Sequence, residues 1–249
     1  MVYNWINNIQ FWLFPAICLL CKAPGTSKRD LCSGCYGDLP HNTNACRSCA
    51  IPLEPEGSLI CGHCQTHPPP FESALAPFRY EPLVDVLVRD LKFRSHLPTA
   101  RLLGELLYEH TEKHCTSKPD GIVPIPLHPT RLRERGFNQA LELARPIARR
   151  WNVPILANHV YRVRATAPQS QLDLKTRLTN VHGAFGIKRS LQARHVAIID
   201  DVVTTGSTVA EMARVLRATG VEAVQVWSVA RTSPYELGVN RDTGSLEMS

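Results

Sequence analysis

The chain of 249 residues is long enough for one sizeable α/β domain and a small accessory module, because a single hydrophobic core is comfortable at roughly 100 to 200 residues. Hydrophobic residues make up 44% of the sequence and charged residues 20%. This balance excludes an extensively disordered chain, since enough apolar side chains are present to offset the entropy of folding. The apolar run over residues 11–20 is too short for a transmembrane segment, and no Lys or Arg precedes it as in a secretory signal.

The first predicted element is a short helix over residues 4–14. Trp5, Ile9 and either Trp12 or Leu13 share one face of this helix, which favours packing against the rest of the fold. A membrane-surface role for the same apolar face is the alternative.

Eight of the nine cysteines form four C-x-x-C pairs between residues 18 and 64. Two thiolates separated by two residues turn onto one tetrahedral Zn²⁺, and two such pairs complete a closed structural site. We therefore predict two structural zinc ions bound by successive pairs, although a cross-braced arrangement that joins the first pair to the third fits the same spacing. The predicted ligands are Cys18, Cys21, Cys32 and Cys35 for the first ion, and Cys46, Cys49, Cys61 and Cys64 for the second.

The cysteine pattern also indicates a module and a compartment. Gly34 and Gly62 suit the tight turns of zinc knuckles. Thiols that stay available for a metal indicate a reducing environment, which predicts a cytoplasmic protein. Residues 15–67 are predicted to form a double zinc ribbon, and the HPPP run at residues 67–70 a linker, because consecutive prolines favour extended geometry.

Residues 71–231 alternate between apolar strand patterns and helical patterns, and the polar tail at 232–249 is predicted to fray. The alternation predicts an α/β fold with a mostly parallel sheet covered by helices on both faces. The expected strands lie near residues 75–80, 121–126, 160–164, 195–200 and 222–230. The expected helices lie near residues 83–93, 98–114, 138–151, 172–181 and 207–219.

The string VAIIDDVVTTGST over residues 196–208 is the strongest functional motif. An apolar strand brings Asp200 and Asp201 to the edge of the sheet where α/β proteins bind ligands. The two carboxylates are suited to accept hydrogen bonds from vicinal ribose hydroxyls or to hold Mg²⁺. The loop that follows enters a helix, whose N-terminus favours a terminal phosphate. The predicted phosphate ligands are Thr204, Thr205, Gly206, Ser207 and Thr208.

This motif resembles the signature of type I phosphoribosyltransferases, which implies phosphoribosyl pyrophosphate as the ligand. A turn acid at Asp201 and a simple helix cap at Ser207 are the structural alternative. Two further segments are predicted to face the pyrophosphate, namely residues 123–140 after a strand and the long polar segment 161–185, which suits a loop that closes over a charged ligand. Their candidate ligand residues are Arg131, Arg135, Gly136, Asn138, Arg164, Gln169 and Arg177, with Lys92 and Arg94 as further candidates.

The net charge of +6 is unevenly distributed. Residues 129–194 contain thirteen Lys or Arg and three acidic residues, a net charge of +10. Such a concentration predicts a polyanionic partner, either the phosphates of a small ligand or single-stranded DNA, with solvated helix faces as the alternative. Little base stacking is expected, because Phe137, Trp151, Tyr161 and Phe185 are few and resemble core residues.

Taken together, the cysteine pairs, DLKFR, VPIPLHPTRLRERGFNQA, RATAPQSQ with RLTNVHGAF, and IIDDVVTTGST resemble the ComF family of competence-associated proteins. The resemblance covers most of the chain, from about residue 18 to 231. It implies a zinc ribbon ahead of a phosphoribosyltransferase-like domain, binding of phosphoribosyl pyrophosphate with Mg²⁺, and a cytoplasmic role with single-stranded DNA and the DNA-uptake machinery in natural transformation or in the use of DNA as a nutrient.

Three functions are compatible with these motifs. The first is a DNA-uptake factor that binds phosphoribosyl pyrophosphate and single-stranded DNA. The second is an active phosphoribosyltransferase that transfers ribose 5-phosphate to an acceptor. The third is a phosphoribosyl pyrophosphate sensor or a zinc-ribbon interaction module. Fold alone does not separate them.

Overall fold

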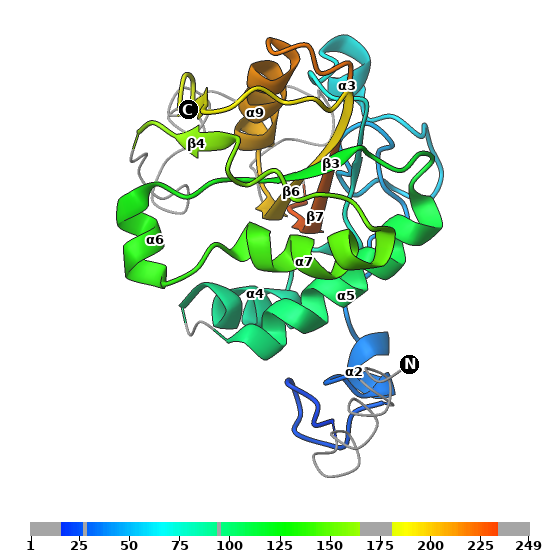
Figure 1. Cartoon of the computed structure of the whole chain (residues 1–249). Coiled ribbons are helices and arrows are strands. Elements are labelled where there is room, and N and C mark those ends of the chain that lie inside the picture. Colours follow the sequence, from blue (N-terminus) through cyan, green and yellow to red (C-terminus); the bar gives the residue numbers. More distant parts are fainter. Residues whose placement is uncertain (1–15, 27–28, 94–95, 165–180, 234–249) are drawn as a thin grey trace, which may run out of the picture.

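A mostly parallel β-sheet forms the centre of the molecule (Figure 1). The computed structural model describes residues 16–26, 29–93, 96–164 and 181–233. Four strands run parallel in the order β1-β7-β6-β3, and β2 also pairs with β7. These strands are β1 (Ser73–Leu75), β2 (Phe78–Arg79), β3 (Gly121–Pro124), β6 (His195–Val203) and β7 (Ala223–Arg231).

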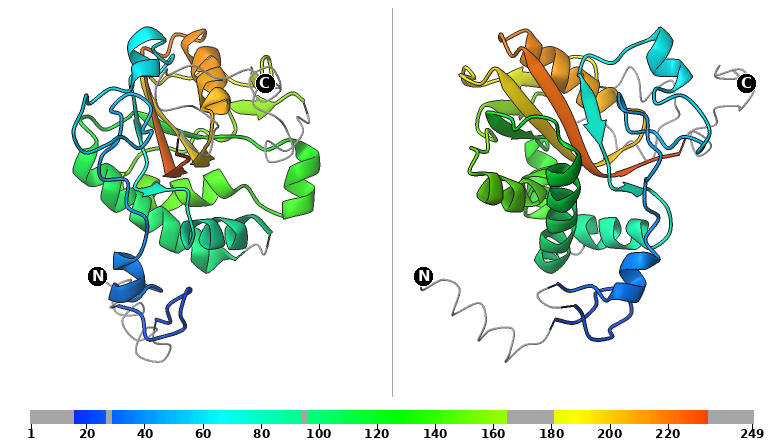
Figure 2. Two further views of the ribbon diagram at one scale, coloured as in Figure 1. Left: turned by 180° about the vertical axis from the view of Figure 1, so that it is seen from behind. Right: turned by 90° about the vertical axis from the view of Figure 1, so that its right-hand side faces the viewer.

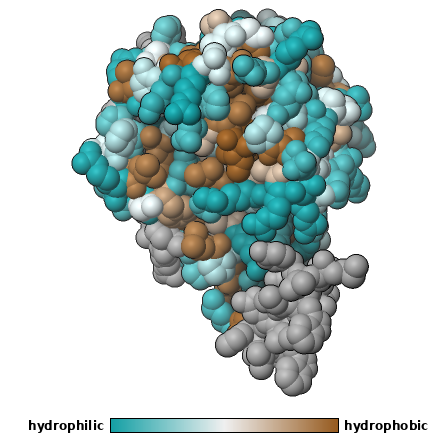
Figure 3. All heavy atoms as spheres, viewed as in Figure 1, coloured by the Kyte–Doolittle hydropathy of each residue, from teal (hydrophilic) through white to brown (hydrophobic). Residues whose placement is uncertain are grey.

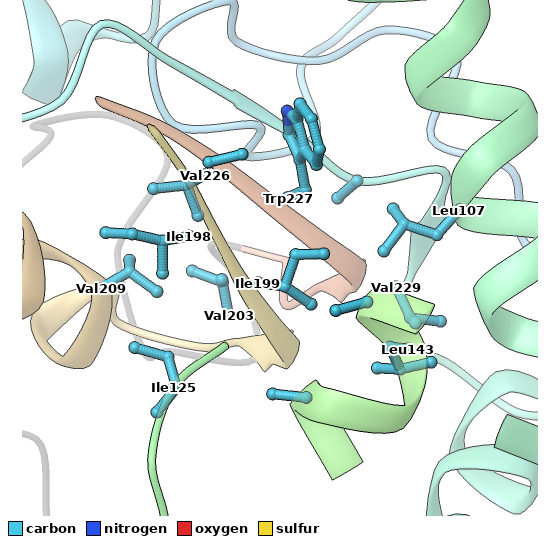
Figure 4. Close-up of a cluster of buried hydrophobic side chains, with 14 of the residues drawn as sticks. Leu107, Ile125, Leu143, Ile198, Ile199, Val203, Val209, Val226, Trp227 and Val229 are labelled. Carbon is cyan, nitrogen blue, oxygen red and sulfur yellow. The ribbon is translucent and has the colours of Figure 1, made fainter. Parts of the chain in front are cut away.

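Helices cover both faces of this sheet, as the sequence predicts. Ile198 and Ile199 follow one another on β6 and therefore point to opposite faces. Figure 4 shows Ile198 beside Val209, and Ile199 on the side of Leu107 and Leu143. The covering helices are α9 (Ser207–Arg217) on the first face, and α4 (Val84–Phe93), α5 (Leu97–His114) and α7 (Gln139–Trp151) on the second.

The face under α5 and α7 is packed around Trp227, which is fully buried on β7. Its ring meets that of Trp151 edge to face, with centroids 5.2 Å apart and planes at 82°. Close approach of the two helices requires Gly104, since a Cβ atom there would lie 2.9 Å from Cγ of Pro146. This close packing of α5, α7 and β7 fills the core on that face of the sheet.

Two strands differ from their predicted form. The strand expected at residues 75–80 is split into β1 and β2, because Pro77 has no N–H to donate to a ladder. The strand expected at 160–164 is β4 (Val160–Arg162), which pairs antiparallel with β5 (Phe185–Ile187) in a separate sheet. β5 was not predicted, since three residues are too few to display alternation.

Two further differences affect the region of the candidate site. β6 continues to Val203 instead of ending at residue 200, so both acids lie within the strand. Residues 129–135, predicted as a loop, form helix α6 (Pro129–Arg135), which proline at the first helical position favours. The helices expected at 4–14 and 172–181 lie outside the described residues, except for Val181, and so does the tail after residue 233. Thr232, assigned to the tail, is buried, and its N–H donates to the carbonyl oxygen of Val203 at 3.1 Å.

The cysteine-rich segment spans the molecule from one end to the other. Its short helices α2 (Ser33–Gly37) and α3 (Gly62–Thr66) lie at opposite ends of the described structure in both views of Figure 2. The first ribbon meets α5 through an ion pair between Arg29 and Glu109. Cys18, Leu31, Leu39 and Ala50 are buried in the same apolar cluster as the residues of the sheet. Both ribbons are therefore packed against the α/β core.

Within the described part of the chain, no helix combines the length and apolar character that crossing a bilayer requires.

We expect Leu107→Ala to lower the free energy of unfolding by about 2–5 kcal/mol, because it leaves a cavity where a leucine with 0% exposure was packed. Leu97→Ala on the same helix is the matched control, since Leu97 is 56% exposed and should change stability by about 0.5 kcal/mol or less. Urea denaturation of both variants makes the comparison. Equal losses would contradict the described packing of α5.

Candidate functional site

The four cysteine pairs are brought together as two separate four-cysteine groups. Within each group, the sulfur atoms lie within 4.8 Å of one another. The first group contains Cys18, Cys21, Cys32 and Cys35, and the second Cys46, Cys49, Cys61 and Cys64. Pairing is thus sequential as predicted, which excludes the cross-braced alternative, and none of the eight cysteines forms a disulfide.

The sulfur geometry fits tetrahedral zinc. Sγ atoms of Cys21 and Cys32 are 3.7 Å apart, and those of Cys49 and Cys61 are 3.8 Å apart. A tetrahedron with Zn–S bonds of about 2.3 Å has edges of about 3.8 Å. The N–H of Cys61 donates to Sγ of Cys46 at 3.3 Å, a contact that suits a thiolate acceptor. The groups are therefore two structural metal sites with four sulfur ligands each.

Gly34 and Gly62 lie in the turns of the second cysteine pairs, but they are not the residues with left-handed backbone conformation. Gly34 and Gly62 lie inside α2 and α3. The left-handed residues are Lys22, with φ of 66°, and Ala50, with φ of 58°, each directly after the second cysteine of the first pair in its group. A hydrogen bond from the N–H of Ala50 to the carbonyl oxygen of Cys46 closes the second turn at 2.8 Å. Metal ligation on both sides explains why non-glycine residues tolerate this conformation.

The acid pair lies near the carboxyl end of β6. Asp200 and Asp201 are adjacent on the strand, so their side chains start toward opposite faces of the sheet. Asp201 is buried, and Nζ of Lys92 on α4 lies 3.0 Å from its Oδ2. Lys92, a further candidate ligand residue from the sequence, therefore lies beside the acids. It neutralises one carboxylate of the pair.

Asp200 lacks such a close cation among the described contacts, although positive charge surrounds it. Burial and the neighbouring charge of Asp201 raise the pKa of Asp200 to about 7, while Lys92 and Arg162 oppose the shift. A desolvated carboxylate of this kind gains from a hydrogen-bond donor or a cation. The acid pair thus has the electrostatics of a site for hydroxyl groups or for a divalent ion.

Arginines from α6 and β4 lie near enough to this acid pair for its charge to act on them. Burial lowers the pKa of Arg135, and the charge of Asp201 acts in the opposite direction. Burial likewise lowers the pKa of Arg162, and the charge of Asp200 acts in the opposite direction. Nη1 of Arg135 donates to Oε1 of Gln139 at 3.1 Å, which fixes the guanidinium against α7. The predicted Arg131 lies close enough for its charge to affect both arginines.

Gly136 and Asn138 shape the corner between α6 and α7. Gly136 ends α6 with φ of 76°, a left-handed conformation that only glycine adopts without cost. Oδ1 of Asn138 accepts from the N–H of Leu141, and its Nδ2 donates to the carbonyl oxygen of Ile125. Both polar groups of the Asn138 side chain are therefore engaged with the backbone. Gly136 and Asn138 therefore set the orientation of α6 and of the arginines that it carries.

The predicted phosphate loop, residues 204–208, joins β6 to α9. Gly206 is the N-cap of α9 with φ of 83°, while the space around it is open apart from Val203. Glycine is thus required by the backbone conformation and not by crowding. The hydroxyl oxygens of Thr205 and Ser207 are 2.8 Å apart, and the N–H of Ser207 donates to Oγ1 of Thr205 at 3.3 Å. The loop therefore gathers hydroxyl groups at a helix N-terminus.

Apart from Arg94, which follows α4, the remaining predicted residues belong to the segment between β4 and β5. Nη2 of Arg164 donates to the carbonyl oxygen of His182, and a carboxylate oxygen of the buried Glu211 on α9 accepts from the N–H of Gly183 at 2.7 Å. These contacts fasten the described ends of the segment. Arg94, Gln169 and Arg177 lie outside the described residues.

Two residues near the site were missed or misjudged. Arg231, at the end of β7, donates to the carbonyl oxygen of Thr204, the first residue of the predicted phosphate loop; its only signal in the sequence is a charged residue at the end of the apolar run AVQVWSVAR. Tyr161 was taken for a core residue but is 46% exposed. Its ring lies over Gly186, the residue opposite it on β5, where a Cβ atom would be 2.6 Å from the ring. Phe185, by contrast, is buried as expected.

The cysteine-rich segment matches a family model described as a double zinc ribbon domain over residues 9–65. DNA utilization protein YhgH of Salmonella typhimurium is 37% identical over 223 residues, which covers 88% of this chain and 98% of that protein. Competence protein F of Haemophilus influenzae is 34% identical over 222 residues, covering 86% and 96%. Among solved structures, the chain is similar to adenine phosphoribosyltransferase of Trypanosoma brucei. The match covers 69% of this chain and 78% of that enzyme's chain, with 13% identity and a TM-score of 0.40.

The protein is thus an α/β protein with a mostly parallel sheet, preceded by a double zinc ribbon with two four-cysteine groups. It belongs to the ComF family, together with DNA utilization protein YhgH and competence protein F. The family resemblance found in the sequence motifs is confirmed.

We expect the purified protein to contain two zinc ions per chain, because both four-cysteine groups have the spacing of closed tetrahedral sites. Cys21→Ser should remove the ion of the first group, and Cys61→Ser that of the second. Elemental analysis by mass spectrometry measures both effects. One zinc or none in the unaltered protein would overturn the assignment.

Proposed function

We propose that this protein binds phosphoribosyl pyrophosphate at the carboxyl end of β6 and handles single-stranded DNA in DNA uptake or in the use of DNA as a nutrient. One observation carries the ligand assignment: near its end β6 carries a partly buried Asp200 and a buried Asp201, and two residues later a loop of glycine and hydroxyl residues leads into α9. The names of the relatives, which refer to DNA utilization and competence, support the DNA part.

Each part of the ligand has a chemically matched group in this proposal. The 5-phosphate binds to residues 204–208, where backbone N–H groups and the dipole of α9 favour an anion. Asp200 and Asp201 accept the ribose hydroxyls or hold Mg²⁺, which supplies a charge bridge between those hydroxyls and the pyrophosphate. Arg131 and Arg135 of α6 donate to the pyrophosphate. These donors stabilise the negative charge of the ligand, which is the main contribution that such a site makes.

Asp200→Asn combined with Asp201→Asn is expected to abolish Mg²⁺-dependent binding of phosphoribosyl pyrophosphate, because amides neither attract the cation nor accept as strongly. Isothermal titration calorimetry with Mg²⁺ present measures the loss.

Asp120→Asn provides the matched control. Asp120 lies at the opposite edge of the same sheet, where its Oδ2 accepts from the N–H groups of Arg194 and His195. Its variant should bind as the unaltered protein does. Circular dichroism must report an unchanged fold for all variants, and undiminished affinity in the double variant would place the ligand elsewhere.

The proposed DNA surface is narrower than the basic stretch suggests. Arg145 and Arg194 are paired with Glu142 and Glu222, which reduces their attraction for a phosphate chain. Arg133 on α6 is exposed. It lies on an element that also exposes Leu132, while β4 exposes Tyr161. Figure 3 shows the side of the molecule seen in Figure 1, and there apolar side chains interrupt a hydrophilic surface.

This mixture of arginine and exposed aromatic or apolar groups supports a single-stranded nucleic acid as the polyanion. The backbone of a single strand binds to arginines, and its unpaired bases stack on rings such as that of Tyr161. A duplex would leave the ring unused, because its bases are stacked on one another.

We expect labelled single-stranded oligonucleotide to bind with an affinity that falls steeply with salt. Arg133→Gln should lower the slope of log affinity against log salt by about 0.7, the value for one phosphate contact to a single strand. Tyr161→Ala should weaken binding with little change of slope, since stacking releases no counterions. Fluorescence anisotropy at several salt concentrations separates the two effects.

Arg101→Gln is the control for this titration, because Arg101 is an exposed arginine on α5, paired with Glu105. It should leave both affinity and slope unchanged. Saturating phosphoribosyl pyrophosphate should alter DNA affinity, and linkage requires an equal reverse effect. Salt-independent DNA binding would contradict the electrostatic mechanism. Equal DNA affinity with and without phosphoribosyl pyrophosphate would show that the DNA site and the phosphoribosyl pyrophosphate site are independent.

Transfer of ribose 5-phosphate to an acceptor is the second function that the site supports, since positioning and charge stabilisation suffice for such a reaction. A pyrophosphate-release assay with single-stranded DNA and with free nucleobases distinguishes it from binding alone.

A further inference from the structure

One buried arginine joins the second zinc ribbon to the beginning of the phosphate loop. Arg231 is the last residue of β7 and is only 4% exposed. Its Nε donates to the carbonyl oxygen of Cys49 at 3.0 Å. Its Nη1 donates to the carbonyl oxygen of Val203 at 3.1 Å and to that of Thr204. A single guanidinium thus holds three carbonyl groups from two segments that are distant in sequence.

The charge of Arg231 needs a partner, because burying an unpaired cation is costly. In the described ranges, no carboxylate lies within ion-pair distance of it. Its Nε contacts the backbone of Cys49, so the guanidinium lies beside the second four-cysteine group. A zinc ion with four thiolates keeps a net negative charge. The second four-cysteine group is therefore the electrostatic partner that makes the burial of Arg231 tolerable.

The other end of this connection is the phosphate loop. Val203 is paired in register with Arg231 across β6 and β7, and its carbonyl oxygen also accepts from the N–H of Thr232 at 3.1 Å. Thr204 is the first residue of the loop, and its carbonyl oxygen is held directly by the guanidinium. The direction in which the chain leaves β6 toward Gly206 is thereby fixed. Loss of Arg231 removes this fixation and leaves the side chains of the loop unaltered.

We propose that Arg231 is a positioning residue through which the metal-bound second zinc ribbon sets the shape of the phosphate loop. The ribbon holds the guanidinium, and the guanidinium holds the carbonyl groups of Val203 and Thr204. The effect on loop rigidity follows from these contacts alone. The effect on ligand affinity rests on the proposed function of the loop as a phosphoribosyl pyrophosphate site.

Amide hydrogen exchange of the full-length, zinc-loaded protein tests the first effect. Arg231→Met keeps an unbranched apolar side chain in place of the aliphatic part of arginine but has no donors, so exchange in peptides covering residues 202–210 should rise about tenfold, the effect of losing a hydrogen bond worth about 1.4 kcal/mol. Exchange in β3 should stay as it is, because a local fixation is lost and not the global fold. Arg231→Lys should fall in between, since one ammonium cannot reach all three carbonyl oxygens.

Arg217→Met is the matched control. Arg217 also donates to two carbonyl oxygens, those of Pro70 and Glu222, but it lies at the far end of α9. Its loss should leave exchange in residues 202–210 unchanged. If Arg231→Met fails to fold, the intermediate Arg231→Lys variant still decides, because unchanged loop exchange in that variant overturns the proposal.

A double-mutant cycle connects the effect to the metal site. Cys61→Ser should raise exchange of the loop in the presence of Arg231 and raise it no further in Arg231→Met. Independent, additive effects would mean that the ribbon does not act through Arg231, and would overturn the proposal.

Calorimetric titration with phosphoribosyl pyrophosphate and Mg²⁺ completes the test. Affinity should fall about tenfold in Arg231→Met, in line with the loss of one such hydrogen bond. If the unaltered protein does not bind this ligand, the proposed function fails, while the exchange experiments still decide the role of Arg231. If binding is intact and loop exchange does not respond, the positioning role fails and the proposed function stands.

Discussion

Parallel pairing of β6 with β7 is the constraint on which the rest of the structure depends. The register runs from His195 opposite Ala223 to Val203 opposite Arg231, and both strands are almost entirely buried. Because the strands are parallel, their carboxyl ends lie at one edge of the sheet. The acid pair, the entry into the phosphate loop and Arg231 all lie at that edge. A shift of register by one residue would turn Asp201 away from Lys92 and break the contact of Arg231 with Val203.

The same edge concentrates charged groups where little water reaches them. Its structure therefore depends on placing each charge beside an opposite one. Lys92 neutralises Asp201, the arginines of α6 and β4 lie around Asp200, and the second four-cysteine group accompanies Arg231. Each of these groups comes from a different element. Buried charges contribute little net stability, because desolvation offsets much of their attraction. Their value here is specificity, since only one arrangement of α4, α6, β4 and the second ribbon brings each of these charges to its counterpart.

Much of this could be predicted from the sequence, because periodicity and local chemistry act over short distances. The apolar run VAII and the acids after it identify β6 and the edge of the sheet, and the spacing of the cysteines identifies both metal sites. What could not be predicted depends on contacts between distant segments. A charge at the end of an apolar run does not by itself distinguish Arg231 from a solvated arginine, and the exposure of Tyr161 accompanies the pairing of β4 with β5 outside the main sheet. The knuckle conformations of Lys22 and Ala50 likewise follow from metal geometry, whereas composition favours the nearby glycines.

The placement of the two ribbons follows from the small size of each. A segment of this length buries too little apolar surface to fold by itself, so it relies on metal and on a larger neighbour. The segment between the ribbons is fastened to the turn between β1 and β2, where the N–H of Asn42 donates to the carbonyl oxygen of Pro77 and its Nδ2 to that of Ala76. That anchor leaves the first ribbon against α5 and the second against the end of β7. Through the contact of Cys49 with Arg231, the second ribbon therefore reaches the same edge of the sheet as the acid pair and the start of the loop that follows β6.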